Sequence, residues 1–172
     1  MNHPHLFDEC VPVLLRYLAS LERIVLAVEA LPHEKRASVL QAKLAADMLP
    51  MYRQVETAAY FALRTAYPLA GLAVPRYVAV EPTTEALSES IKNTIRLVAE
   101  LPPSQFATAQ SRSISEKAGN AAIELPAQAF LAEFALPNFF FHLNMAYAIA
   151  RMSGCALGKA DYDGFHVYRA EA

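Results

Sequence analysis

Four side chains in this sequence are spaced so that they could do chemistry together. His142 lies near the centre of the most apolar long segment of the chain, residues 137–152. Asp47 and Gln54 would share one face of a helix, because side chains seven residues apart return to the same side. Tyr147 follows His142 on the apolar segment. If the two faces meet, His142 and Asp47 could pair inside the protein, with Gln54 and Tyr147 as helpers.

Three interpretations of this group remain open, and none assigns a catalytic residue. In the first, Asp47 accepts a hydrogen bond from His142 and the pair is structural, because a buried polar group without a partner is costly. In the second, both side chains bind a divalent metal (Zn²⁺, Ni²⁺ or Fe²⁺), and Gln54, Tyr147 or water completes the site. In the third, they form an acid–base pair without a metal, since an imidazole titrates near neutral pH.

The elements that must position these residues are predicted to be helices. Apolar residues recur every three or four positions over residues 5–31, 44–67, 84–101 and 126–152. Prolines bound or interrupt these segments at positions 32, 50, 102, 103, 126 and 137. Residues 33–42 are polar and are expected to form an exposed connection or a frayed turn. The pattern predicts an all-α fold, an antiparallel up-and-down four-helix bundle in one domain over residues 1–172.

The segment between Gln105 and Leu125 has a different pattern. Arg112–Ser115 and Ala121–Leu125 alternate weakly between polar and apolar residues. Between them lies Gly119–Asn120, a pair that tolerates positive φ. We predict a small hairpin here, with a plain loop as the alternative. It would be inserted between the third and fourth helices and lie across one face of the bundle.

Composition excludes some functions and favours others. The 172 residues are 55% hydrophobic and 19% charged, a balance that favours extra buried surface such as a homodimer interface. The formal net charge of −2 argues against a nucleic-acid partner. Polar residues and Pro137 within the apolar segment argue against a membrane span. Because no signal peptide is recognisable and Cys10 and Cys155 lack metal or redox spacing, we expect reduced thiols and a cytoplasmic location.

Several motifs resemble an uncharacterised bacterial family. They are Leu136–Pro137–Asn138–Phe139–Phe140–Phe141–His142, Ala146–Ile149, Gly154 with Leu157–Tyr162, Ala46–Met51 and Gln54–Val55. The family is a domain of unknown function assigned to the DinB/YfiT-like superfamily of helical bundles, and the resemblance spans nearly the whole chain. It implies a DinB-like bundle that is often dimeric.

For function, the resemblance implies less. Many superfamily members bind a divalent metal through three histidines, one on the second helix and two spaced four apart on the last. Some resemble thiol-dependent S-transferases or maleylpyruvate isomerases. In this chain the positions four before and four after His142 are Asn138 and Ala146, and the second helix offers Asp47. The three-histidine site therefore cannot be assembled from these residues.

Two functions follow as hypotheses. The first is a small-molecule-binding or metal-dependent enzyme of the transferase kind, with a degenerate metal site at His142 and Asp47 and substrate contacts from Gln54 and Tyr147. The second is a non-catalytic bundle for dimerisation or partner binding, with Asp47 and His142 as a core pair. We interpret Lys159 and Asp161 as a solvated tail in which the two pair at the surface, with substrate contacts over a pocket at the end of the bundle as the alternative. From His3 and His5 we expect at most incidental metal contacts.

Overall fold

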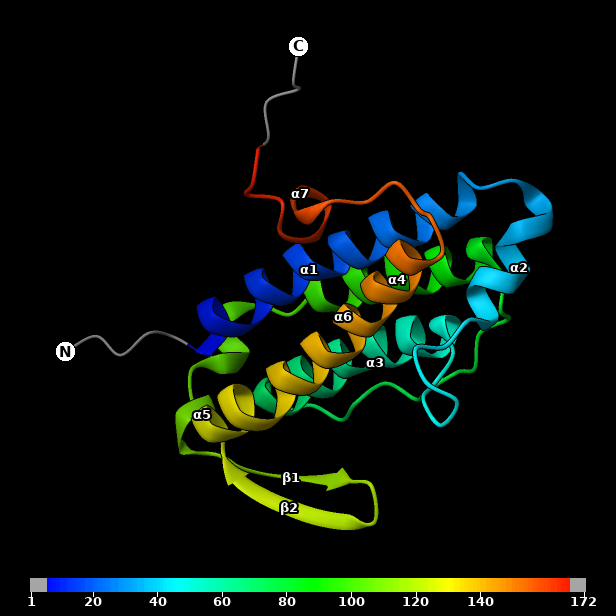
Figure 1. Cartoon of the computed structure of the whole chain (residues 1–172). Helices are drawn as coiled ribbons and strands as arrows, with labels where there is room; N and C mark the ends of the chain where they lie inside the picture. The colour runs from blue at the N-terminus through cyan, green and yellow to red at the C-terminus, as the bar shows by residue number, and fades with distance from the viewer. Residues whose placement is uncertain (1–5, 168–172) are drawn as a thin grey trace.

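The computed structural model describes residues 6–167 and is mostly helical (Figure 1). His3 and His5 lie outside the described residues. The helices and strands, in chain order, are α1 (Leu6–Glu29), α2 (His33–Gln41), α3 (Met51–Leu69), α4 (Thr84–Ala99), β1 (Ser113–Ala118), β2 (Ala121–Pro126), α5 (Ala127–Ala129), α6 (Leu136–Met152) and α7 (Lys159–Asp163). Two 3₁₀ turns, Pro103–Phe106 and Ala109–Ser111, precede β1, and a π-helical segment, Phe130–Ala135, joins α5 to α6.

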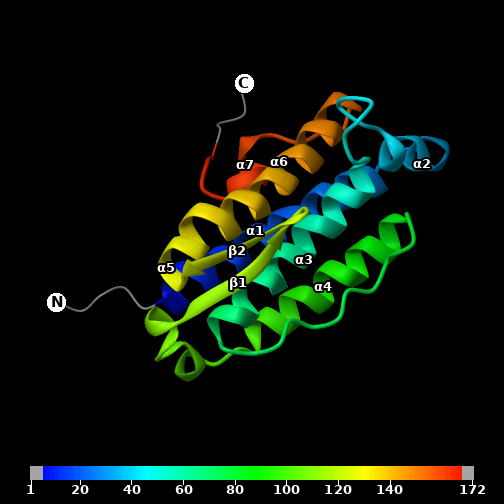
Figure 2. The ribbon, with the colours of Figure 1, turned by 90° about the horizontal axis from the view of Figure 1, so that it is seen from below.

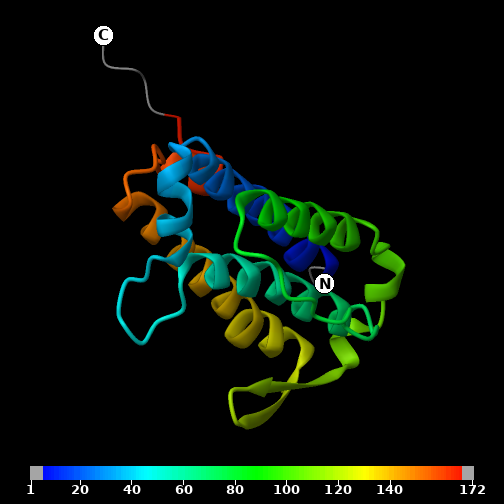
Figure 3. The ribbon, with the colours of Figure 1, turned by 90° about the vertical axis from the view of Figure 1, so that its right-hand side faces the viewer.

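Four long helices, α1, α3, α4 and α6, pack side by side around the apolar core (Figures 1 and 3). The helix directions differ from the predicted up-and-down arrangement, because the consecutive helices α3 and α4 run in the same direction (Figure 3). Residues 70–83 return along the whole bundle between them. This crossover segment is long enough, since about 12 extended residues span roughly 40 Å and a 16-residue helix only roughly 24 Å.

The second predicted helix begins later than its apolar pattern indicated. Residues 42–50 form an irregular loop, and α3 begins at Met51 directly after Pro50, whose extended backbone provides the N-cap. A proline disfavours the helical region for the residue before it, so the pattern at 44–49 cannot continue into α3. Residues 33–41, predicted as a connection, form α2, because Val39 and Leu40 are buried against the core.

The hairpin prediction is confirmed. β1 and β2 pair antiparallel, with Ser113 opposite Pro126 and Ala118 opposite Ala121. Gly119 has a φ of 62°, which glycine adopts without steric cost. The hairpin projects from the end of the bundle and runs along the face formed by α3 and α6 (Figures 1 and 2). The predicted interruption of the fourth helix is also present, as the π-helical segment before Pro137.

The remaining predictions concern the core and the ends of the chain. Cys10 and Cys155 are free thiols and both are buried, as expected. Asp161 lies in α7, where its carboxylate accepts a hydrogen bond from Gly158 N at 2.7 Å and its carbonyl accepts one from Arg23. The predicted solvated tail is thus a short helix, and Asp161 bonds to Gly158 and Arg23 where a pair with Lys159 was expected. Within residues 6–167, no helix combines the length and the apolar character needed to cross a bilayer.

Candidate functional site

His142 on α6 meets Gln54 on α3, with Nδ1 of the imidazole 2.7 Å from Oε1 of the amide. The two groups face each other because α3 and α6 pack along their length. The other end of the amide, Nε2, donates to the carbonyl of Leu49 at 3.2 Å, so Oε1 is the atom that accepts from the imidazole. His142 therefore carries its proton on Nδ1, and its Nε2 holds a lone pair.

The surroundings of His142 keep the imidazole neutral. Burial lowers its pKa to about 4, and the positive charge of Arg64 acts in the same direction. The ring of Phe61 stacks on the imidazole with centroids 5.6 Å apart, and Phe141 contacts it edge-on at 5.2 Å. At pH 7 the side chain is thus a neutral hydrogen-bond donor at Nδ1 and an acceptor at Nε2.

The side chain of His142 is partly exposed, and its Nε2 has no partner within the described chain. In the part of the chain that the structure describes, the buried side-chain polar atoms without a hydrogen-bond partner are Ser88 Oγ and Gln105 Oε1. Nε2 of His142 is not one of them, and no side chain or backbone group of residues 6–167 hydrogen bonds to it. Nε2 is therefore an acceptor without a partner in the described chain, on a residue that is partly exposed.

Arg64 connects His142 to the hairpin. Its guanidinium lies 4.4 Å from the centroid of Phe61, the ring that stacks on His142. Its Nε and Nη2 lie 3.1 and 3.0 Å from the two carboxylate oxygens of Glu116 on β1, and Nη2 also donates to the carbonyl of Lys117. Sequence reasoning did not single out Arg64 and Glu116, which are 52 residues apart. The only local signal was that Arg64 follows Phe61 by one helical turn.

Two of the predicted site residues lie elsewhere. Asp47 is exposed in the 42–50 loop, and within residues 6–167 it forms no hydrogen bond or ion pair with His142. The predicted Asp47–His142 hydrogen bond is therefore replaced by the bond from His142 to Gln54, because the loop before Pro50 removes Asp47 from the face that carries Gln54. Tyr147 packs edge-on against Tyr162 of α7, with centroids 5.5 Å apart.

These positions also bear on the predicted divalent metal. Among residues 6–167 no three His, Cys, Asp or Glu side chains are grouped so that they could hold a metal ion. At the predicted site, His142 Nε2 is the one ring nitrogen available, and the amide oxygen of Gln54 already accepts from Nδ1. The described residues do not fit a zinc site with three or four protein ligands.

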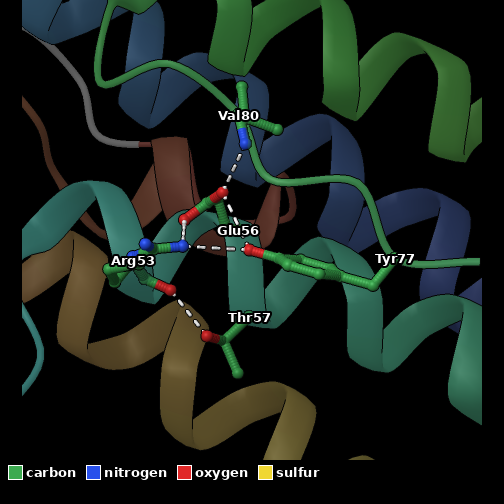
Figure 4. Close-up of polar contacts among 5 residues, drawn as sticks. All are labelled: Arg53, Glu56, Thr57, Tyr77 and Val80. Atoms are coloured by element: carbon green, nitrogen blue, oxygen red, sulfur yellow. Dashed lines mark hydrogen bonds and ion pairs between the residues drawn. The ribbon is translucent and has the colours of Figure 1, made fainter.

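A second polar group lies where α3 faces the crossover segment (Figure 4). Glu56 is 4% exposed, and its carboxylate accepts hydrogen bonds from Arg53 Nη1 at 2.9 Å, Tyr77 Oη at 3.0 Å and Val80 N at 2.8 Å. Burial, together with the bond to Glu56, raises the pKa of the Tyr77 phenol. A pocket of about 110 Å³ adjoins this group between α3, α4 and the crossover segment. Both oxygens of the carboxylate accept hydrogen bonds from this chain, and these bonds attach the crossover segment to α3.

The fold and the His142 group define a helical-bundle protein with a single-histidine polar site. Residues 6–163 match DUF1993, a domain of unknown function, and the chain belongs to this family. It is also similar to a solved structure, the crystal structure of a DinB family member protein from Shewanella denitrificans. The two are 30% identical, the match covers 96% of each chain, and the TM-score is 0.84. No curated protein matches the chain. The resemblance to an uncharacterised DinB-like family is thereby confirmed.

Proposed function

We propose that this DinB-like protein binds a small molecule at His142. The ligand would donate a hydrogen bond, from a hydroxyl, amine or amide group, to Nε2 of the imidazole. The observation that carries the proposal is the fixed tautomer: Gln54 Oε1 accepts the hydrogen bond from Nδ1–H, which leaves a lone pair on Nε2 of a partly exposed residue. A purely structural histidine would not need an accessible acceptor atom.

The pKa of His142 favours binding over proton transfer. A general base works best when its pKa lies near the working pH. Burial lowers the pKa of His142 to about 4, so at pH 7 the imidazole is a weak base. The acid–base interpretation with Asp47 also loses its second member, because Asp47 lies in the exposed 42–50 loop. The proposal therefore contains no proton-transfer step and no metal.

The test is a ligand screen that compares wild type with two variants. Small hydroxy, amino and amide compounds are titrated while two-dimensional NMR follows the imidazole of His142 and the backbone of α3 and α6. We expect compounds that shift wild-type resonances to lose binding by at least about tenfold in His142→Phe, which keeps an aromatic ring but removes the acceptor. Tyr147→Phe is the matched control, because Tyr147 faces α7. Equal binding to wild type and His142→Phe would contradict the proposal.

A specific observation favours a second proposal, that the chain forms a homodimer through α6. Phe141, Met145, Ala148 and Met152 follow one another at spacings of four, three and four residues, which places them on one side of the helix. Phe141 is 50% and Met152 61% exposed, so the side is apolar and open. We expect sedimentation to give a dimer for wild type and a monomer for the Phe141→Glu, Met152→Glu double variant. A wild-type monomer at micromolar concentration would refute it.

A further inference from the structure

We infer that the ligand of the His142 site carries a carboxylate, which takes the place of Glu116 on Arg64. The inference rests on the proposed function and adds to it the chemical class of the ligand. A compound with a carboxylate for Arg64 and a hydroxyl or amine for His142 Nε2 is a hydroxy or amino carboxylate. Arg64 and His142 are both neighbours of the Phe61 ring.

The first support is that Arg64 already holds a carboxylate in two-point geometry. Two guanidinium nitrogens, Nε and Nη2, face the two oxygens of Glu116 at 3.1 and 3.0 Å. Arginine forms this paired arrangement with any carboxylate of suitable access, from the protein or from solution. The side chains of Arg64 and Glu116 are 20% and 17% exposed, so the pair lies at the edge of the protein and not in the core. An external carboxylate can reach it.

The second support is that Glu116 lies on an element that is easily displaced. Within residues 6–167, β1 and β2 pair only with each other, and a two-stranded hairpin alone is marginally stable in water. In β1, Ile114 is buried, whereas the positions after it are partly or fully exposed. The hairpin runs along the face of α3 and α6 (Figure 2), and Arg64 fastens it there through Glu116 and the carbonyl of Lys117. Glu116 can therefore leave Arg64 without unfolding the bundle.

This arrangement makes Glu116 a competitor that is part of the chain. Its tether gives it a high effective concentration at Arg64, so a free carboxylate must displace it and binds wild type weakly. Removing the charge of Glu116 removes the competitor and leaves Arg64 in place. We therefore expect Glu116→Gln to bind a hydroxy carboxylate at least about tenfold more tightly than wild type does.

The experiment titrates lactate, and as a neutral counterpart lactamide, into the full chain. NMR follows the Nε–H of Arg64 and the imidazole of His142 in wild type, Glu116→Gln, Arg64→Lys and Glu124→Gln, and the Nε–H of Arg64 also in His142→Phe. Glu124→Gln is the matched control, because it removes the same charge from the same hairpin, at a residue that bonds to Ser113 and not to Arg64. Arg64→Lys keeps the positive charge but cannot form the two-point contact.

The expected result is that lactate shifts the Arg64 Nε–H, binds Glu116→Gln at least tenfold more tightly than it binds wild type or Glu124→Gln, and binds Arg64→Lys weakly. Lactamide should leave Arg64 unchanged. The inference is overturned if lactate binds Glu116→Gln no better than Glu124→Gln, or if lactate and lactamide bind alike. If both shift His142 alone, the inference fails and the proposed function stands. If lactate shifts Arg64 equally in wild type and in His142→Phe, the proposed function fails and the carboxylate site stands.

Discussion

Replacing Glu56 by alanine is expected to destabilise the protein by about 2 kcal/mol, because it removes a buried carboxylate that accepts three hydrogen bonds. Tyr77 Oη, Val80 N and Arg53 Nη1 all donate to this carboxylate, whose side chain is almost completely buried. Residues 70–83 would lose their attachment to α3 where Figure 4 shows it. The free energy of unfolding, measured by urea denaturation at pH 7, checks the prediction.

Two further variants show whether the hydrogen bonds are responsible. Tyr77→Phe removes one donor and keeps the ring against Tyr60, so we expect a loss of about 1 kcal/mol. Glu85→Ala, an exposed acidic residue at the start of α4, should cost less than Glu56→Ala does. A loss for Glu56→Ala no larger than that of Glu85→Ala would show that the crossover segment does not depend on the buried carboxylate.

His142 is expected to lower the stability of the protein by about 1 kcal/mol between pH 7 and pH 5. This is less than the full pKa shift would give, because the imidazole is partly exposed and solvent screens its charge. In the unfolded chain a histidine has its ordinary pKa near 6.5, whereas in the folded protein burial lowers it to about 4. Between these two pKa values the unfolded state binds more protons than the folded state. The stability contributed by the neutral His142 is therefore fully present above pH 6.5 and is lost as the pH falls toward 4.

The matched variant for this pH dependence is His142→Gln, which has no titrating group at the position. Urea denaturation of both proteins at pH 7 and pH 5 should show a larger loss for wild type. Burial acts to raise the pKa of Glu116, but its bonds to Arg64 and to Lys117 N lower it overall. The stabilisation by Glu116 is therefore lost only below about pH 4.5, and Glu116 is present in both proteins. The same loss in wild type and His142→Gln would mean that the imidazole is not held neutral.

Much of the secondary structure could be predicted from local patterns. α1 and α4 lie within a residue or two of their predicted ranges, and Thr83 caps α4 by accepting from Ala86 N at 3.2 Å. The hairpin was predictable because Gly119 and its neighbour mark the turn. The direction of α4 was not predictable, because nothing local in residues 70–83 indicates whether the segment turns back at once or crosses the bundle. The partly buried bond from Val80 N to Glu56 holds the crossing segment on α3, and it joins residues 24 apart.

His142 and Gln54 of the candidate site could be predicted from the sequence, whereas Arg64 and Glu116 could not. His142 stood out as the imidazole in an apolar segment, and Gln54 was among its expected helpers. Asp47 was expected to meet His142 because it was placed on the same helical face as Gln54, but Pro50 ends the helical pattern between the two. Arg64 and Glu116 meet only because the hairpin folds back over α3, a contact that no periodicity in either segment indicates.

The central claim is that His142 is neutral, with its proton on Nδ1 and a free lone pair on Nε2. The most direct measurement is ¹⁵N NMR of the imidazole nitrogens of wild-type protein between pH 8 and pH 4. The account predicts a protonated Nδ1 and an unprotonated Nε2 throughout the neutral range, with a midpoint near pH 4. A proton on Nε2 at pH 7, or a midpoint near the ordinary histidine value of about 6.5, would contradict it.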